Sequence, residues 1–173
     1  MSDRPFLSVI MPTYNGAAFL DRALASMAAE RRADLPLEIV AVDDGSDDRT
    51  LDILRGWSER LPLTIEARGR GGSWVAATNA GLERARGRYA CFLHQDDLWL
   101  PGRLEALRAE VVRHPGAVML LSPSRFIDAR DRDCGLSRSP LSTGRLLGAC
   151  DVLPHLAVQN FIPIPAPVFE LEA

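Results

Sequence analysis

Short apolar runs alternate with stretches of helical spacing along most of this chain, and this alternation restricts its possible folds more than any other feature. Five of the runs are expected to form buried strands, at residues 7–11, 37–42, 63–67, 89–93 and 118–122. Helices are expected after the first four, over residues 17–29, 47–57, 73–85 and 101–114. This order is typical of an α/β fold, in which right-handed crossovers build a mostly parallel sheet with helices on both faces.

The last fifty residues are richer in turn-forming residues. Residues 123–143 are expected to be mostly loop, with one strand near residues 125–127, and a short helix is expected over residues 146–158. Prolines at 163, 165 and 167 exclude a central strand before Val168. At 173 residues, the chain has the size of one domain.

Composition and charge exclude several classes of function. All 20 basic residues are arginine, which excludes chemistry that needs a P-loop, Schiff-base or kinase-type lysine. A net charge of −3 and dispersed arginines give no basic footprint for nucleic acid or an anionic membrane. The three cysteines form no CxxC pair and are expected to be reduced thiols. Because no apolar run approaches the roughly 18 residues that span a bilayer, we expect a cytoplasmic protein, at most peripheral on the inner membrane face.

Polar residues follow each of the first four expected strands. In parallel sheets, ligands bind beyond the carboxyl ends of the strands. The expected site therefore combines four short segments, at residues 12–15, 43–46, 68–72 and 94–97. Together they supply an aromatic ring, two pairs of carboxylates and a loop rich in arginine and glycine, a set too polar for the core.

Asp96 and Asp97 follow a strand that should be buried, and adjacent carboxylates at such a place need a cation, donors or water. A hard divalent ion such as Mg²⁺ is commonly held by one or two carboxylates together with substrate phosphates. Capping of the following helix is the alternative for this pair. His94 is the histidine beside them, and a place in the core is as reasonable for it as metal ligation.

The other strand ends suggest a nucleotide. An ionised carboxylate such as Asp44 accepts hydrogen bonds from a pyrimidine N–H or a ribose hydroxyl, although an N-cap role is the alternative, with Asp47 or Ser46 also available as cap. Tyr14 could lie flat against a base, or simply pack, and Thr13 could donate to the base or ribose.

The loop from Arg68 to Ser73 precedes a helix, so its backbone N–H groups and arginines could meet phosphate. Asn79 lies within that helix, either near the ligand or merely in solvent.

These segments, in their order and spacing, strongly resemble the family 2 glycosyltransferases, which have the GT-A nucleotide-diphospho-sugar transferase fold. The resemblance rests on residues 8–15 (SVIMPTYN), 38–46 (EIVAVDDGS), 79–89 (NAGLERARGRY) and 92–99 (FLHQDDLW). It implies that Pro12, Thr13 and Tyr14 line the base, that Asp44 binds uracil or its equivalent, and that Asp96 and Asp97 hold Mn²⁺ or Mg²⁺ against the diphosphate. We expect Arg68 and Asn79 to be further donor-binding residues.

The resemblance also implies an inverting transfer of the sugar from a nucleotide-sugar donor, in particular a UDP-sugar, to a hydroxyl of a glycan or lipid-linked acceptor. Two positions depart from the family pattern, since His94 stands where an Asp is common and Thr78 where an Arg is common. No carboxylate has a context matching the catalytic base, which we expect to lie outside this chain; the carboxylates of residues 128, 131, 133 and 151 are expected as turn or cap residues.

We accordingly expect residues 1–122 to form the donor-binding core and residues 123–173 the incomplete start of an acceptor-side region. The alternative function is a non-catalytic module that binds a nucleotide or nucleotide sugar. A sugar-phosphate nucleotidyltransferase is disfavoured, because residues 12–15 replace the Gly-rich loop with Arg and Lys that such an enzyme needs.

Overall fold

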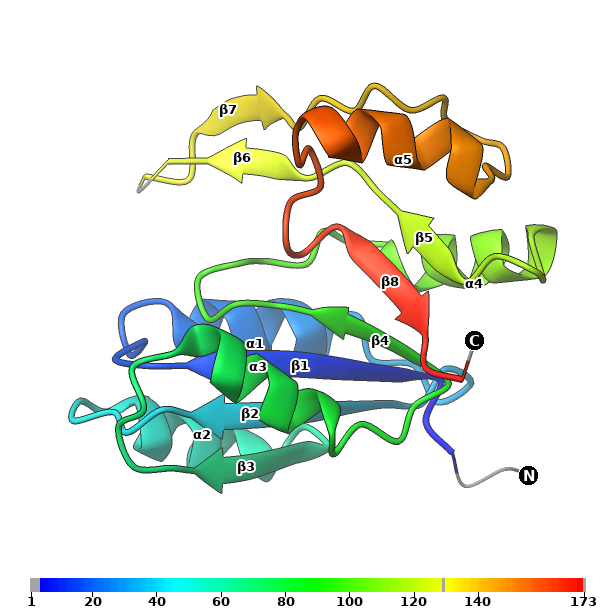
Figure 1. Ribbon diagram of the computed structural model, residues 1–173. Coiled ribbons are helices and arrows are strands. Elements are labelled where there is room, and N and C mark those ends of the chain that lie inside the picture. The colour runs from blue at the N-terminus through cyan, green and yellow to red at the C-terminus, as the bar shows by residue number, and fades with distance from the viewer. Residues whose placement is uncertain (1–3, 129, 173) are drawn as a thin grey trace.

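A computed structural model describes residues 4–128 and 130–172 of the protein (Figure 1). Its elements are, in chain order, β1 (Leu7–Thr13), α1 (Leu20–Ala29), β2 (Leu37–Asp43), α2 (Thr50–Ser58), β3 (Leu63–Ala67), α3 (Trp74–Leu82), β4 (Tyr89–Phe92), α4 (Arg103–Arg113), β5 (Met119–Leu121), β6 (Arg125–Ile127), β7 (Asp133–Leu136), α5 (Ala149–Val158) and β8 (Pro167–Glu170). The main sheet has the strand order β3-β2-β1-β4-β8-β5. The predicted α/β fold with a mostly parallel sheet is confirmed.

The first four strands run parallel to one another, and β8 is antiparallel to its neighbours β4 and β5. β8 begins at Pro167, one residue earlier than expected, and that residue is the first of the strand, where a missing N–H is tolerated. Pro12 is also tolerated, although it lies in the central strand β1. The pairing of β1 with β4 ends at Ile10, so the sheet needs no hydrogen bond from an N–H at position 12 to β4.

Helices cover both faces of the sheet, as predicted, with α1 and α2 behind it and α3 in front in Figure 1. Alternate residues of the buried strands point to opposite faces. Val9 and Met11 of β1 join the larger core with α1 and α4, whereas Ile10 joins a smaller core with Ala77 of α3. Gly81 lets α3 lie close to the sheet, because a Cβ there would come within 2.6 Å of the Ile10 side chain.

A buried carboxylate secures the amino-terminal ends of the central strands. Glu38 accepts hydrogen bonds from the Ser8 hydroxyl and the Arg86 backbone, each at 2.6 Å, and pairs with the Arg86 guanidinium at 2.9 Å. The Ser8 hydroxyl in turn accepts the Gly87 N–H at 2.8 Å. Burial raises the pKa of Glu38, but these hydrogen bonds outweigh it and keep that pKa below the ordinary value. The network fixes the α3–β4 connection against β1 and β2.

Two local predictions were wrong. Asp47 is not the cap of the second helix: α2 begins at Thr50, and the carboxylate of Asp48 accepts the Thr50 N–H at 2.8 Å, whereas the Asp47 N–H donates to Asn15. The segment expected as loop contains β7, which pairs with β6 to form a separate two-stranded sheet.

The hairpin of β6 and β7 and the helix α5 lie outside the main sheet (Figure 1). Every residue of both strands is exposed, and α5 has no buried residue. Cys91, Cys134 and Cys150 are free thiols, as expected. Among the helices that the structure describes, none has both the length and the apolarity needed to cross a membrane.

Candidate functional site

Four loops meet beyond the carboxyl ends of β1, β2, β3 and β4, at the side to which the four arrows point in Figure 1. They are the segments expected to carry the site, now placed as residues 14–16, 44–46, 68–73 and 93–97. The parallel register of the strands brings them to one edge, so side chains far apart in the sequence meet there.

Thr13 and Asp43 form the base of this edge. Asp43 is fully buried, and its carboxylate accepts the Ser46 N–H at 2.9 Å and the hydroxyls of Ser46 and Thr13. Thr13 is 2% exposed, and Pro12 before it is buried. These groups shape the loop after β2, and that loop presents the next residue, Asp44.

Asp44 lies at the centre of a cluster with Tyr14 and the Gly-rich loop. Its two oxygens accept the N–H groups of Gly71 and Gly72, each at 2.8 Å, and its carboxylate pairs with the Arg70 guanidinium. The hydrogen bond from Gly71 and those from Gly72 and Arg70 lower the pKa of Asp44, so the group is an anion at neutral pH. The same guanidinium lies over the Tyr14 ring, 3.7 Å from its centre.

Gln95 joins the loop after β4 to the loop after β1. Its side-chain amide donates to the Tyr14 carbonyl at 3.0 Å and accepts the Tyr14 N–H at 2.9 Å. Gly16 makes room for this contact, because a Cβ there would lie 2.2 Å from the Gln95 oxygen. The sequence offered no signal for this link beyond a polar residue inside the acidic motif.

The acidic motif itself forms a compact group of three side chains. Ligand atoms of His94, Asp96 and Asp97 all lie within 4.8 Å of one another. Burial, and then the neighbouring charge of Asp96, raises the pKa of the Asp97 carboxyl. The buried Nε2 atom of His94 has no hydrogen-bond partner among the described residues. One imidazole and two carboxylates fit a divalent metal ion, since both groups are common ligands of such ions.

A tryptophan that the sequence analysis did not single out stands beside this group. Trp74 is the first residue of α3, and its ring centre lies 5.4 Å from that of His94, in an edge-to-face arrangement. Only its place directly after the Gly-rich loop could have marked it.

Arg68 and Asn79 lie less centrally than the other expected site residues. The Arg68 guanidinium donates to the Ala76 carbonyl at 3.3 Å, so it is Arg70 that reaches Asp44. Asn79 is exposed, five residues after Trp74 and therefore about 7.5 Å further along the helix axis.

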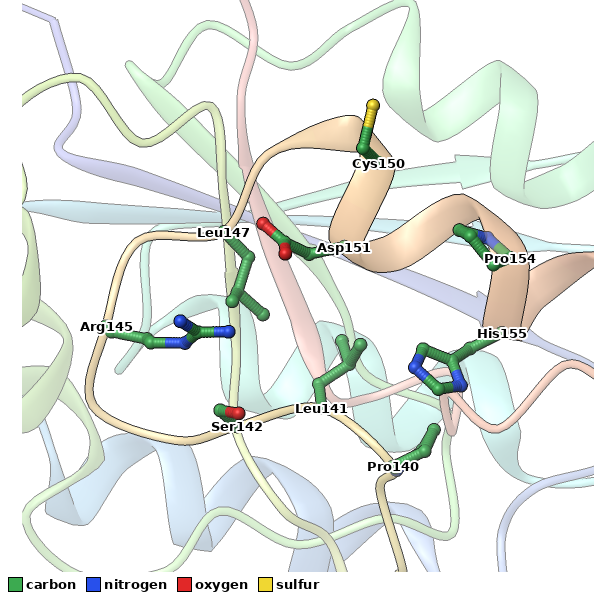
Figure 2. A pocket seen from close by; sticks show the side chains of 9 residues that line it. All are labelled: Pro140, Leu141, Ser142, Arg145, Leu147, Cys150, Asp151, Pro154 and His155. Atoms are coloured by element: carbon green, nitrogen blue, oxygen red, sulfur yellow. The ribbon is translucent and has the colours of Figure 1, made fainter.

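Three of the four carboxylates expected as turn or cap residues serve in that way. Asp128 accepts the N–H groups of Arg130 and Arg132, Asp133 accepts the Gly135 N–H, and Asp151 accepts the Gly148 N–H at the start of α5. The Asp131 carboxylate instead pairs with the Arg22 guanidinium of α1 at 2.7 Å. Asp151 also borders an open pocket of about 280 Å³ between α5 and the preceding loop, which Figure 2 shows with Cys150 pointing away from the other side chains. All residues that line this pocket come from residues 140–155, so none of the four site loops takes part in it.

Comparison with known proteins points to one family. The profile described as Glycosyl transferase family 2 matches residues 8–147. An uncharacterized glycosyltransferase of Nostoc sp. PCC 7120 is 35% identical over 131 residues, which cover 73% of this chain and 38% of that protein. Validoxylamine A glucosyltransferase of Streptomyces hygroscopicus subsp. jinggangensis is 38% identical over 61% of this chain and 25% of its own length. The matched segments thus cover well under half the length of these relatives.

Solved structures give the same picture. Residues 1–349 of TarS from S. aureus match 95% of this chain and 47% of that one, with a TM-score of 0.76 and 23% identity, and so confirm the predicted GT-A-like fold. The complex of the same fragment with UDP-GlcNAc matches 66% of this chain and 33% of that one, with a TM-score of 0.63 and 30% identity. The mannosyltransferase PcManGT from Pyrobaculum calidifontis, in complex with GDP-Man and Mn²⁺, matches 75% of this chain and 38% of that one, at 28% identity and a TM-score of 0.60.

Proposed function

Because the chain belongs to glycosyl transferase family 2, we propose that it binds the nucleotide part of a sugar donor across the ends of β1, β2 and β4. The donor is a UDP-sugar, and the sugar is transferred with inversion to a hydroxyl of a glycan or lipid-linked acceptor. The observation that carries this proposal is the meeting of Tyr14, Asp44 and the acidic motif at one edge of the sheet. Relatives of this family are solved with UDP-GlcNAc and with GDP-Man, which supports a nucleotide sugar as ligand.

Tyr14 and Asp44 would recognise the base. Tyr14 is 38% exposed and presents a ring that a base can stack on, a contact worth roughly 1–3 kcal/mol. Asp44, held as an anion, accepts an N–H of the base or a ribose hydroxyl. Arg70 lies over one face of the Tyr14 ring, and a base that stacks on that face would displace the guanidinium. Pro12 and Thr13 were expected to line the base, but both are buried, so we propose that they instead support the loop that carries Tyr14. Arg68 and Asn79 stay predicted donor-binding residues.

His94, Asp96 and Asp97 would hold the divalent ion, Mn²⁺ or Mg²⁺. Such an ion neutralises charge on the diphosphate and so makes the nucleotide a better leaving group. The imidazole of His94 stands where the family commonly has a carboxylate, and imidazole favours transition metals over Mg²⁺. We therefore propose that the site binds Mn²⁺ more tightly than Mg²⁺.

In the transfer, the acceptor hydroxyl attacks the anomeric carbon of the donor, the bond to the diphosphate breaks, and a carboxylate base takes the hydroxyl proton. We assign no residue of this chain as that base. Residues 1–122 are proposed as the donor-binding core and residues 123–173 as the start of the acceptor-side region. The expected cytoplasmic location stays a prediction.

Thermal unfolding tests donor binding. The chain is heated with UDP or GDP, each with Mn²⁺, with Mg²⁺ or without metal. A nucleotide at a hundredfold excess over its Kd stabilises a protein by roughly 2.7 kcal/mol. We expect this stabilisation for UDP with Mn²⁺ and its loss in Asp96→Asn. Asp52→Asn, at an exposed carboxylate of α2, is the matched control. Equal melting temperatures with and without either nucleotide would contradict the proposal.

Turnover separates an enzyme from a binding module. The release of UDP from UDP-glucose is measured for the chain together with candidate acceptors. Release by the wild type and not by Asp97→Ala supports an enzyme, whereas binding without release is expected of a module and equally of a chain whose catalytic base lies outside it.

A further inference from the structure

Trp74 is an exposed aromatic residue at the edge of the candidate site. Its side chain is 54% exposed, whereas Trp99 is 5% exposed and packs in the core. The fold therefore leaves more than half of this indole open to solvent or to a ligand.

One cap and one ring contact place Trp74. The side chain of Ser73 accepts the Ala76 N–H at 3.2 Å and so defines the first turn of α3, where the backbone of Trp74 lies. The indole ring packs edge-to-face with the ring of His94, whose ligand atom lies within 4.8 Å of those of Asp96 and Asp97. The indole therefore contacts the His94 ring, which belongs to the acidic motif.

More than half of the Trp74 side chain is open to solvent. A ligand held by the acidic motif would thus find an exposed aromatic surface next to it.

We propose that Trp74 is the platform for the sugar of the donor, a hexopyranosyl group that stacks with its C–H face on the indole. This inference rests on the proposed function, because the sugar is bonded to the phosphate that the acidic motif would hold. One face of a pyranose with equatorial hydroxyls carries only C–H groups, and an indole face attracts their positive edges. Trp74 would then select the sugar, while Tyr14 and Asp44 select the base.

Val75 provides a matched control on the same turn. It is 47% exposed and adjacent in sequence, and it belongs to neither the ring contact with His94 nor the acidic motif. A loss caused only by exposed apolar surface on α3 would affect Val75→Ala as much as Trp74→Ala.

The test compares a donor with its own nucleotide by calorimetry in the presence of Mn²⁺. The pair is UDP with UDP-glucose, whose ring hydroxyls are all equatorial. Trp74→Ala should weaken binding of the sugar nucleotide about tenfold and leave binding of the free nucleotide unchanged, with most of the loss restored in Trp74→Phe. Val75→Ala should change neither affinity.

Tryptophan fluorescence gives a second readout. In the wild-type chain, the sugar nucleotide should change the emission beyond the change caused by the free nucleotide, and Trp74→Phe should abolish this difference while Trp57 and Trp99 still emit. Equal losses for nucleotide and sugar nucleotide in Trp74→Ala, or no loss for either, would overturn the inference and leave the donor site standing. If neither UDP nor GDP binds to the wild type, the proposed function fails, and the inference fails with it.

Discussion

Most large apolar residues are buried in the part of the molecule from β1 to α4 and exposed in the part from β6 to α5. In the first, β1 and β2 are buried along their whole length, and the polar loops at their ends are fixed by side chains that bond to backbone. In the second, apolar residues such as Phe126, Leu136 and Val158 are more than half exposed. The comparison teaches that a site of this kind depends on packing beneath it, because rigid elements hold its loops in position.

The largest effect should come from removing a buried carboxylate. Glu38→Ala leaves the Ser8 hydroxyl and the Arg86 N–H without their acceptor and should lower the free energy of unfolding by about 3 kcal/mol. Asp128→Ala removes a carboxylate with as many hydrogen bonds, but at the β6–β7 turn, where its side chain is 27% exposed, and should cost much less. Urea unfolding measures both. Equal losses would break the contrast between the two parts.

A second comparison concerns aromatic residues. Tyr14→Ala removes the ring proposed to stack on the base and should weaken UDP binding by about 2 kcal/mol, roughly thirtyfold, with Tyr14→Phe close to wild type. Phe126→Ala, at a ring that is 51% exposed on β6, should leave UDP binding unchanged. Calorimetry with Mn²⁺ measures the affinities. A similar loss in both variants would mean that the base binds elsewhere.

The two glutamines of the chain allow the same comparison between the site and the part from β6 to α5. Gln95→Ala removes both bonds to the Tyr14 backbone and should weaken UDP binding by about 1 kcal/mol, roughly fivefold, because the ring loses its fixed position. Gln159→Ala, at the exposed end of α5, should have no effect. The factor by which Mn²⁺ increases the affinity for UDP is a further measurement. This factor should be smaller in Gln95→Ala than in the wild type. An unchanged factor would contradict a role of Gln95 in joining the two loops.

The smallest effect is expected in acid. Hydrogen bonds keep the native pKa of Glu38 below its ordinary value of 4.5, and the bonds from Arg132 do the same for the pKa of Asp128, ordinarily 3.8. The stability from each group is therefore present above its unfolded pKa and is lost as the pH falls through its native pKa. Glu38→Gln should flatten this loss in urea unfolding at low pH more than Asp128→Asn, whose charge is screened by water. The reverse order would contradict the difference in burial.

Sequence periodicity predicted the strands and helices of the main sheet because burial sets that pattern directly. It also predicted that Tyr14, Asp44 and the acidic motif would meet, since parallel strands end at one edge. It could not predict which side chains bond across loops. Arg70 rather than Arg68 reaches Asp44, and the Gln95 link depends on the turn at Gly16.

β7 was missed for another reason. Its four residues are exposed and include Gly135 at a positive φ of 106°. The sequence therefore has no alternation of apolar and polar residues that would indicate a strand there. The helix α5 was predicted although it is exposed and contains Pro154, a residue that disfavours a helix interior.

The position of β8 bears on how this chain folds during synthesis. β1 to β4 follow one another in the chain, and each can join the sheet soon after it leaves the ribosome. β5 cannot, because its partner in the main sheet is β8, which follows β6, β7 and α5 in the chain. Until β8 emerges, the edge of β4 and the whole of β5 have unpaired backbone groups, which can pair with another nascent chain. Slow translation between β5 and β8 would therefore favour aggregation, and β5 should join the main sheet only after β8 has been made.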